Sequence, residues 1–281
     1  MQTTKLPISV IIPCYNCSAS IDRAIKSVME QIALPSEIIL IDDCSDDSLL
    51  TIKAIRNYQK KYKNLNIVIL QMASNKGPAN ARNEAWNHAT QPYLAFLDAD
   101  DAWHPKKLSI QYAWMKKHPE VFLTAHNSNH IEHSESFLKI GTRIDFLKVN
   151  LLKLLFFNYF PTRSVMLKRN IKYRFLPDKK YAEDYLLWLS IALDGHPVYY
   201  LDQQLSYSFK NDFGDSGLTS DLFKTHRGVI DTYRQLLNQH KISTLVFSIA
   251  VFFAQIKLLR RYIIVFFRKI IITLQRFFWS S

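Results

Sequence analysis

Four short runs of aliphatic and β-branched residues occur in the first hundred positions, and stretches with helical spacing separate them. The runs are ISVII (8–12), EIILI (37–41), NIVIL (66–70) and YLAFL (93–97). Nearly continuous apolar runs are typical of parallel strands that helices cover on both faces. The alternation therefore predicts a βαβαβαβ order and an α/β fold.

The pattern becomes less regular after residue 104. We expect a helix at 105–117, a strand at 121–125, a helix near 144–157, a strand at 163–168, a helix at 184–193, and short strands at 198–201 and 205–209. These elements predict a second lobe, residues 105–240, that continues the sheet of the first lobe, residues 1–104. Residues 241–281 form a separate tail.

Polar clusters follow each of the four apolar runs. They are PCYN (13–16), DDCSDDS (42–48), NKGPANARN (75–83) and DADD (98–101). Because the carboxyl ends of parallel strands meet at one edge of a sheet, and ligands bind there in open α/β folds, we expect these clusters to form one site.

The DADD cluster places Asp98, Asp100 and Asp101 at the end of the fourth strand. Like charges at this spacing repel, so a fold that gathers them usually supplies a cation. Carboxylate oxygens suit Mg²⁺ or Mn²⁺. An acidic turn in which Asp101 stabilises the start of the next helix is the alternative, and the cluster alone leaves both open.

The third cluster is suited to a phosphate group. Gly77 and Pro78 open a helix whose first N–H groups are free, Lys76 precedes them, and Arg82 lies one turn inside. Two cations at a helix N-terminus fit a diphosphate. An ordinary capped helix is the alternative.

The paired acids Asp42 and Asp43 end the second strand, close to Tyr15. A carboxylate can accept a hydrogen bond from a base N–H while a tyrosine ring stacks on the base. This combination predicts a nucleobase pocket. Receiver domains also gather acids at strand ends, but there the paired acids follow the first strand and the phosphoacceptor the third.

Composition and charge exclude several classes of protein. The net charge is +12, but residues 241–281 carry +7 of it and contain no acid, so the folded part has no basic cluster suited to nucleic acid. We therefore expect no nucleic-acid partner. Three cysteines exclude a disulfide framework, and Cys14-x-x-Cys17 is interpreted as a pair of reduced strand-end cysteines rather than a redox or zinc site. The N-terminus lacks the pattern of a signal peptide, which predicts a cytosolic start.

The motifs VIIPCYN, IDDCSDDS, NKGPANARN, FLDADD and AEDYLLWL, in this order, resemble the family 2 glycosyltransferases with the GT-A fold, across roughly residues 7–240. The resemblance implies a Rossmann-like, mostly parallel central sheet with flanking helices. It also implies a nucleotide-sugar donor across the sheet edge, Mn²⁺ or Mg²⁺ bridging the diphosphate to a DxD motif, and inversion at the anomeric carbon.

Carried over by position, the resemblance gives roles to single residues. Asp98 and Asp100 form the DxD motif, with Asp100 the direct metal ligand and Asp98 nearer the ribose or donor sugar. Asp184 becomes the general base, with Glu183 beside it and Trp188 shaping the acceptor pocket. An acid that merely stabilises the first helical turn is the alternative for Asp184. The predicted nucleotide-sugar-binding residues are Pro13, Tyr15, Asn16, Asp42, Asp43, Lys76, Gly77, Arg82 and Asp98.

Two departures from the family pattern matter. The Q-x-x-R-W motif and the transmembrane helices of the processive members are missing from the sequence, so we expect a single sugar addition. FGDSGLTS (213–220) only loosely matches the mobile loop that covers the donor in members of the family.

The spacing of His126, His130 and His133 resembles a zinc site, but their segment follows a predicted strand and lacks helix formers, which disfavours zinc.

The tail is a candidate membrane-binding segment. Its longest uncharged run, residues 242–256, is shorter than the about 20 apolar residues that span a bilayer. On a helical projection its lysines and arginines share about half of the circumference, and the rest is apolar. Residues 242–279 therefore predict a basic amphipathic helix on an anionic membrane surface. A helix packed on the catalytic lobe, or a dimer contact, is the alternative.

These observations favour one function and leave one competitor. The first is an inverting, metal-dependent glycosyltransferase that moves one hexosyl or N-acetylhexosaminyl group from a nucleotide-sugar, preferably UDP-linked, to a lipid-linked or surface-glycan acceptor. It would be peripheral on the cytoplasmic face of the inner (plasma) membrane. The competitor is a non-catalytic, membrane-associated module that binds nucleotide-sugars or glycans. A nucleotidyltransferase is disfavoured because its Gly-rich first loop is missing.

Overall fold

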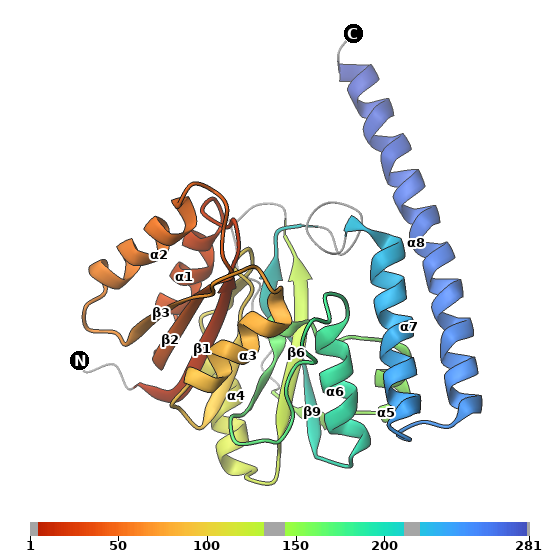
Figure 1. The fold of residues 1–281 in the computed structure, drawn as a ribbon, viewed down its shortest axis with the longest axis horizontal. Helices are drawn as coiled ribbons and strands as arrows, with labels where there is room; N and C mark the ends of the chain where they lie inside the picture. Colours follow the sequence, from red (N-terminus) through yellow and green to blue (C-terminus); the bar gives the residue numbers. More distant parts are fainter. Residues whose placement is uncertain (1–4, 132–143, 211–219, 280–281) are drawn as a thin grey trace.

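A computed structural model describes residues 5–131, 144–210 and 220–279 (Figure 1). Its described strands form a single sheet in the order β3-β2-β1-β4-β8-β6-β9-β5, and β7 pairs with β9. The strands of the first half are β1 (Leu6–Cys14), β2 (Pro35–Asp42), β3 (Ile67–Gln71) and β4 (Tyr93–Phe96). Those of the second half are β5 (Ala102–Trp103), β6 (Leu123–His130), β7 (Phe146–Lys148), β8 (Met166–Lys168) and β9 (Val198–Ser208).

The first half of the sheet has the predicted alternation of strands and helices. β1 pairs in parallel with both β2 and β4, and β2 pairs in parallel with β3. Alternate residues of β1 enter different cores: Ile11 lies in one hydrophobic cluster, while Val10 and Ile12 lie in the other. Both faces are therefore covered, which is why these strands are continuous apolar runs. The crossover helices are α1 (Ile21–Met29), α2 (Leu50–Lys61) and α3 (Pro78–His88).

The second half continues the same sheet with mixed strand directions. β8 is antiparallel to β4 and to β6, whereas β6 and β9 are parallel. The helical segments in this half are α4 (Lys107–Lys117), α5 (Leu151–Phe156), the 3₁₀ turn η1 (Thr162–Ser164), α6 (Glu183–Leu193), α7 (Leu222–Asn238) and α8 (Thr244–Trp279). One sheet thus contains strands from both predicted lobes, and the assignment of donor and acceptor binding to these lobes stays a prediction.

Three expected elements of the second half differ from the structure in type or in bounds. The helix near 144–157 is replaced by the edge strand β7 and the short helix α5, because Asn150 caps α5 by accepting a hydrogen bond from the Lys153 N–H at 3.0 Å. The two short strands at 198–201 and 205–209 are one strand, β9, whose pairing with β6 shifts register near Asn127. The strand at 163–168 is shorter, because the 3₁₀ turn η1 occupies its start.

The last helix extends beyond the body of the molecule. α8 begins beside α7 and α5, contacts both, and its C-terminal half projects away from the sheet (Figure 1). Within the described parts of the chain, no helix combines the length and hydropathy of a membrane-spanning segment.

Candidate active site

The loops after β1 and β2 are tied together at the carboxyl edge of the sheet. Asn16 has a left-handed φ of 47° and donates its N–H to Ser45 Oγ at 3.0 Å. Its side chain accepts from the Asp46 N–H at 3.0 Å and donates to Asp46 Oδ1 at 2.5 Å. Tyr15 is 46% exposed beside this junction, and Pro13 is half-buried. The exposed ring leaves Tyr15 able to stack on a ligand, while Asn16 acts within the scaffold.

The predicted base-reading acids also organise loops. Asp43 accepts hydrogen bonds from the N–H groups of Lys76 at 2.9 Å and Gly77 at 2.7 Å. Gly77 has a φ of 83°, which favours glycine at this position. Burial raises the pKa of Asp43, and these two hydrogen bonds oppose the rise. Asp42 is buried and accepts from Ser45 Oγ at 2.5 Å. Both acids thus fix the loop before α3 and the loop after β2.

Arg82 joins the end of β4 to the start of α6. Its Nη2 lies 2.6 Å from Asp98 Oδ1 and its Nη1 lies 2.7 Å from Glu183 Oε1. The arginine is 4% exposed, so its charge is offset by these two acids in a medium of low polarity. Burial opposes ionisation of Asp98, but the charge and hydrogen bond of Arg82, together with the charges of Arg163 and Lys210, outweigh it and hold the pKa of Asp98 below its usual value. The expected place of Arg82 beside a diphosphate stays a prediction.

The other two acids of DADD have different basic partners. The Asp100 carboxylate pairs with the Lys210 ammonium at the end of β9. Asp101 Oδ2 lies 3.3 Å from Nη1 of Arg163, which belongs to η1. Burial raises the pKa of Asp101 to about 7, although Arg163 opposes the rise. Asp101 does not cap α4. The N-cap of α4 is Lys106, and strand β5 separates Asp101 from it. The alternative of an acidic capping turn is therefore not supported.

The DADD carboxylates do not converge on one point. Over residues 5–131, 144–210 and 220–279, no group of three or more His, Cys, Asp or Glu side chains could hold a metal ion. Mg²⁺ in nucleotide sites, however, typically uses one or two carboxylates and completes its shell with water and phosphate. Asp100 fits that role because its side chain is 35% exposed and its partner is a flexible lysine. The donor set therefore suits a divalent ion bound mainly by Asp100, with Asp98 beside it.

The predicted base lies in the first turn of α6. Asp184 Oδ2 accepts a hydrogen bond from Thr162 Oγ1 at 2.9 Å, and Oδ1 accepts one from the Tyr185 N–H at 2.6 Å. Asp184 is partly exposed, whereas Glu183 is buried and bonded to Arg82. Of the two acids, Asp184 is the one that an acceptor can reach.

Burial controls the protonation of both acids. It raises the pKa of Asp184, while the Arg82 charge and the Thr162 hydrogen bond oppose the rise. Burial and the Asp184 charge raise the pKa of Glu183 to about 7. A helix N-terminus by itself would lower the pKa of Asp184 and weaken it as a base. In this structure the pKa of Asp184 is raised instead, which suits a carboxylate that accepts a proton.

Trp188 lies in the hydrophobic core. Its side chain is fully buried, with its ring centroid 6.4 Å from that of Phe96 and 5.8 Å from that of Phe175. It lies one helical turn beyond Asp184, on the face of α6 that packs on the sheet. The expectation that Trp188 shapes the acceptor pocket is therefore corrected to a role in the core.

Three further residues of the site were missed. Thr162 and Arg163 are adjacent in η1 and contact Asp184 and Asp101 respectively. Lys210 follows β9 and contacts Asp100. All three reach their partners over long sequence separations, and none is in a motif. The sequence near η1 offers only the tripeptide Pro-Thr-Arg (161–163), and this pattern does not predict the contacts.

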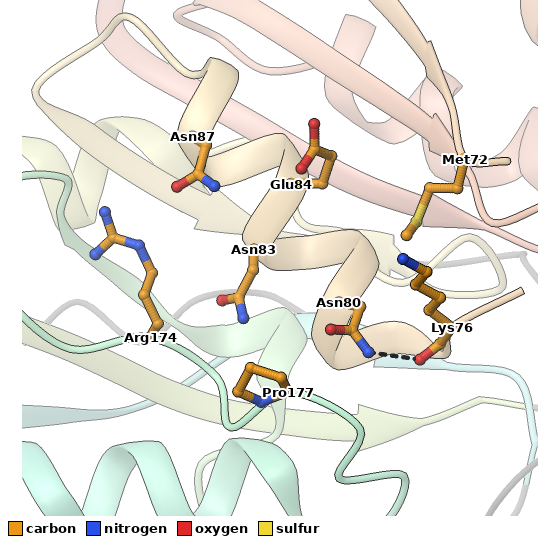
Figure 2. A pocket seen from close by; sticks show the side chains of 8 residues that line it. All are labelled: Met72, Lys76, Asn80, Asn83, Glu84, Asn87, Arg174 and Pro177. Carbon is orange, nitrogen blue, oxygen red and sulfur yellow. Dashed lines mark hydrogen bonds between the residues drawn. The ribbon is translucent and has the colours of Figure 1, made fainter. Parts of the chain in front are cut away.

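A cavity of about 350 Å³ lies beside the predicted donor residues rather than among the acids. Figure 2 shows Asn80 and Asn83 projecting from α3, with Arg174 and Pro177 on the facing segment. Its lining residues are Met72, Lys76, Asn80, Asn83, Glu84, Asn87, Arg174 and Pro177. Of the predicted donor residues, this lining includes Lys76.

The histidines and cysteines form no metal site in the described chain. His126 is fully buried, and its Nδ1 lies 2.7 Å from the Asn127 carbonyl oxygen. Burial lowers its pKa. His130 shares β6 with His126, and His133 lies outside the described residues. The thiols of Cys14, Cys17 and Cys44 are free.

Comparisons with known proteins agree with the geometry. The family model described as "Glycosyl transferase family 2" matches residues 9–175. TuaG of Bacillus subtilis (strain 168), which its name assigns provisionally to teichuronic acid biosynthesis, is 28% identical over 85% of this chain and 92% of its own. WfgD of Escherichia coli, named as a UDP-Glc:alpha-D-GlcNAc-diphosphoundecaprenol beta-1,3-glucosyltransferase, is 31% identical over 67% of this chain and 71% of its own.

A solved structure supports the fold. The S. aureus TarS 1–349 structure in complex with UDP-GlcNAc superposes with a TM-score of 0.64 and 22% identity over 84% of this chain and 69% of that chain. The predicted α/β GT-A architecture, with a mostly parallel central sheet, flanking helices and additional C-terminal helices, is confirmed. The protein is a glycosyltransferase, as the family match and the relatives show. It belongs to glycosyl transferase family 2.

Proposed function

We propose that this protein is an inverting, metal-dependent glycosyltransferase that moves one sugar from a UDP-sugar to a lipid-linked or surface-glycan acceptor. The observation that carries the proposal is the arrangement around Arg82. This buried cation contacts both Asp98, in the DxD motif, and Glu183, next to Asp184. It therefore links the proposed donor and acceptor sides of a single site.

The proposed chemistry follows from this arrangement. The ionised Asp184 carboxylate takes the proton of an acceptor hydroxyl, whose oxygen forms a bond to the anomeric carbon of the donor sugar. The bond from that carbon to the diphosphate oxygen breaks, and its electron pair leaves with the diphosphate. Attack opposite to the leaving group inverts the anomeric configuration. A divalent ion bound by Asp100 would supply positive charge that stabilises the departing diphosphate.

The donor and acceptor classes rest on relatives. WfgD is named for a UDP-Glc donor and a diphosphoundecaprenol-linked acceptor, and the TarS structure contains UDP-GlcNAc. A carboxylate such as Asp43, which could accept a hydrogen bond from a uracil N–H beside the exposed Tyr15 ring, agrees with a UDP donor. We propose the same classes for this chain.

Thermal stabilisation by nucleotides tests the donor assignment. We expect UDP with Mn²⁺, at about 100 times its dissociation constant, to raise the melting temperature by about 5 °C. UDP alone, or Mn²⁺ with GDP, CMP or dTDP, should give a smaller shift. The Asp100→Asn variant is the matched control, and it should lose the part of the shift that depends on Mn²⁺. Equal shifts with and without Mn²⁺ would contradict a metal-dependent donor site.

We further propose that the protein is peripheral on the cytoplasmic face of the plasma membrane, held there by α8. Exposed apolar side chains recur on this helix at alternating spacings of four and three residues, and we call them the α8 stripe. The α8 stripe comprises Leu245, Ile249, Phe252, Ile256, Leu259, Ile263 and Phe266. The tail holds seven basic residues and no acid, which favours an anionic lipid surface over a second basic helix.

Vesicle binding tests this location. The full chain should sediment with vesicles of phosphatidylglycerol and phosphatidylcholine, and about tenfold less with phosphatidylcholine alone. The double variant Phe252→Ser and Phe266→Ser should lose binding, because each replaces a side chain that is more than 60% exposed in the α8 stripe. Ile32→Ser is the control, since Ile32 is 61% exposed on the catalytic body. Absence of vesicle binding, together with a concentration-dependent dimer, would assign the α8 stripe to a second copy instead.

A further inference from the structure

The end of β9 holds Asp100 from two directions. The Arg23 guanidinium donates to the Asp100 carbonyl oxygen at 2.6 Å, and its carbon lies 3.6 Å from the centre of the Phe209 ring. The next residue, Lys210, pairs with the Asp100 carboxylate. Phe209 and Lys210 therefore bring the end of β9 onto both the backbone and the side chain of Asp100.

The Lys210–Asp100 pair is more exposed than the other two ion pairs of DADD. The side chain of Arg82 in its pair with Asp98 is 5% exposed, and the side chain of Asp101 in its pair with Arg163 is 3% exposed. In contrast, Lys210 and Asp100 are each 35% exposed. Partly exposed ion pairs contribute little stability, and a lysine ammonium lies on a flexible stem and hydrates readily. This pair is therefore the one that another cation can displace most easily.

The partner of Asp100 in this pair is a lysine ammonium. The carboxylate that is best placed to bind a divalent ion is thus already paired with a positively charged side chain.

We propose that Lys210 is the resting counter-ion of Asp100 and that a divalent ion binds Asp100 only by displacing it; the inference rests on the proposed metal role of Asp100. A bare ion must break the existing pair and approach the displaced ammonium. An ion that arrives with a nucleotide diphosphate brings negative charge that offsets the repulsion. Lys210 therefore makes metal binding depend on the nucleotide, and it does so by competition at one carboxylate.

Direct Mn²⁺ binding tests the proposal without any turnover. The free Mn²⁺ signal in electron paramagnetic resonance gives the dissociation constant of the full chain, with and without UDP. In the absence of UDP we expect Lys210→Met to bind Mn²⁺ about fivefold more tightly than the wild type, because the competing ammonium is gone. With UDP present the difference should shrink. Lys116→Met, in the last turn of α4, removes an equal charge from an exposed position and should leave the constant unchanged.

The remaining outcomes separate the two proposals. If the wild type binds Mn²⁺ and Lys210→Met binds it equally or more weakly without UDP, the competition is refuted while the metal site stands. If the wild type binds no Mn²⁺ even with UDP, or if Asp100→Asn binds it as well as the wild type, the proposed metal role of Asp100 fails and the inference falls with it. A circular dichroism melting curve confirms that each variant is folded.

Discussion

Replacing Asp184 with asparagine should lower kcat by about 10³-fold, since a positioned general base typically contributes about 10²–10⁴-fold. The amide keeps the shape of the side chain and can still accept the hydrogen bond from Thr162 Oγ1. It cannot take a proton from the acceptor hydroxyl. Release of UDP from the donor, followed in the presence of Mn²⁺ and an acceptor, measures the loss.

The pH dependence gives the same prediction a second measurement. Burial raises the pKa of Asp184, and the base works only when it is ionised. The wild-type kcat/KM should therefore rise with pH through this raised pKa, and the residual activity of Asp184→Asn should lack that rise. Glu183→Gln is the matched control, because it preserves a hydrogen-bond acceptor for Arg82 and should reduce kcat far less. A larger loss in Glu183→Gln than in Asp184→Asn would make Glu183 the base.

Replacing Arg82 with methionine should lower the free energy of unfolding by about 3–5 kcal/mol at pH 7.5, because it leaves two acids without their shared cation. Asp98 and Glu183 both pair with Arg82, at 2.6 and 2.7 Å. Methionine fills a similar volume, so the loss reports the charge rather than a cavity. Urea unfolding at pH 7.5 and pH 5 measures it.

The sign of the pH effect follows from the acid pKa values. Arg82 holds the pKa of Asp98 below its usual value, so this stabilisation is present above the pKa of the unfolded chain and is lost as the pH falls through the folded value. In Arg82→Met the two acids can become neutral at low pH, so the deficit should be smaller at pH 5 than at pH 7.5. The double variant Arg82→Met with Glu183→Gln should recover part of the stability. Equal deficits at both pH values would contradict this account.

A control distinguishes the loss of the ion pairs from the loss of an arginine that packs on an aromatic ring. Arg174 stacks on Trp86, with its guanidinium carbon 4.4 Å from the ring centre, and donates to the carbonyl oxygens of Ile171 and Tyr173. Arg174→Met removes the same charge without stranding a carboxylate. We expect it to cost about 1 kcal/mol or less.

The first half of the fold could be predicted because its signals are local. Buried parallel strands require continuous apolar runs, and the polar clusters mark where each strand ends. The four clusters do lie on one sheet edge, as the contacts of Asn16 with Ser45, of Asp43 with Lys76 and of Arg82 with Asp98 show. Sheet topology therefore brought four separate sequence motifs together at one edge.

The second half was harder to predict because its determinants are not local. β7 is an edge strand of three residues, and nothing in its spacing distinguishes it from the start of a helix. β9 crosses a polar stretch, residues 202–204, that interrupts the apolar pattern. Trp188 lies in a motif next to the proposed base, yet its position on α6 directs it into the core. Two of the basic partners of DADD, Arg163 and Lys210, come from segments more than 60 residues away.

The turn η1 has a consequence for engineering this enzyme. Thr162 contacts Asp184 and its neighbour Arg163 contacts Asp101, so one three-residue turn fixes the proposed base and the end of the acidic motif together. A chimera that exchanges acceptor-binding segments with a relative would have to transplant or preserve residues 161–165 as a unit. An insertion of a single residue there would disturb the contacts to Asp184 and Asp101 at once, whereas neither contact involves helix α8.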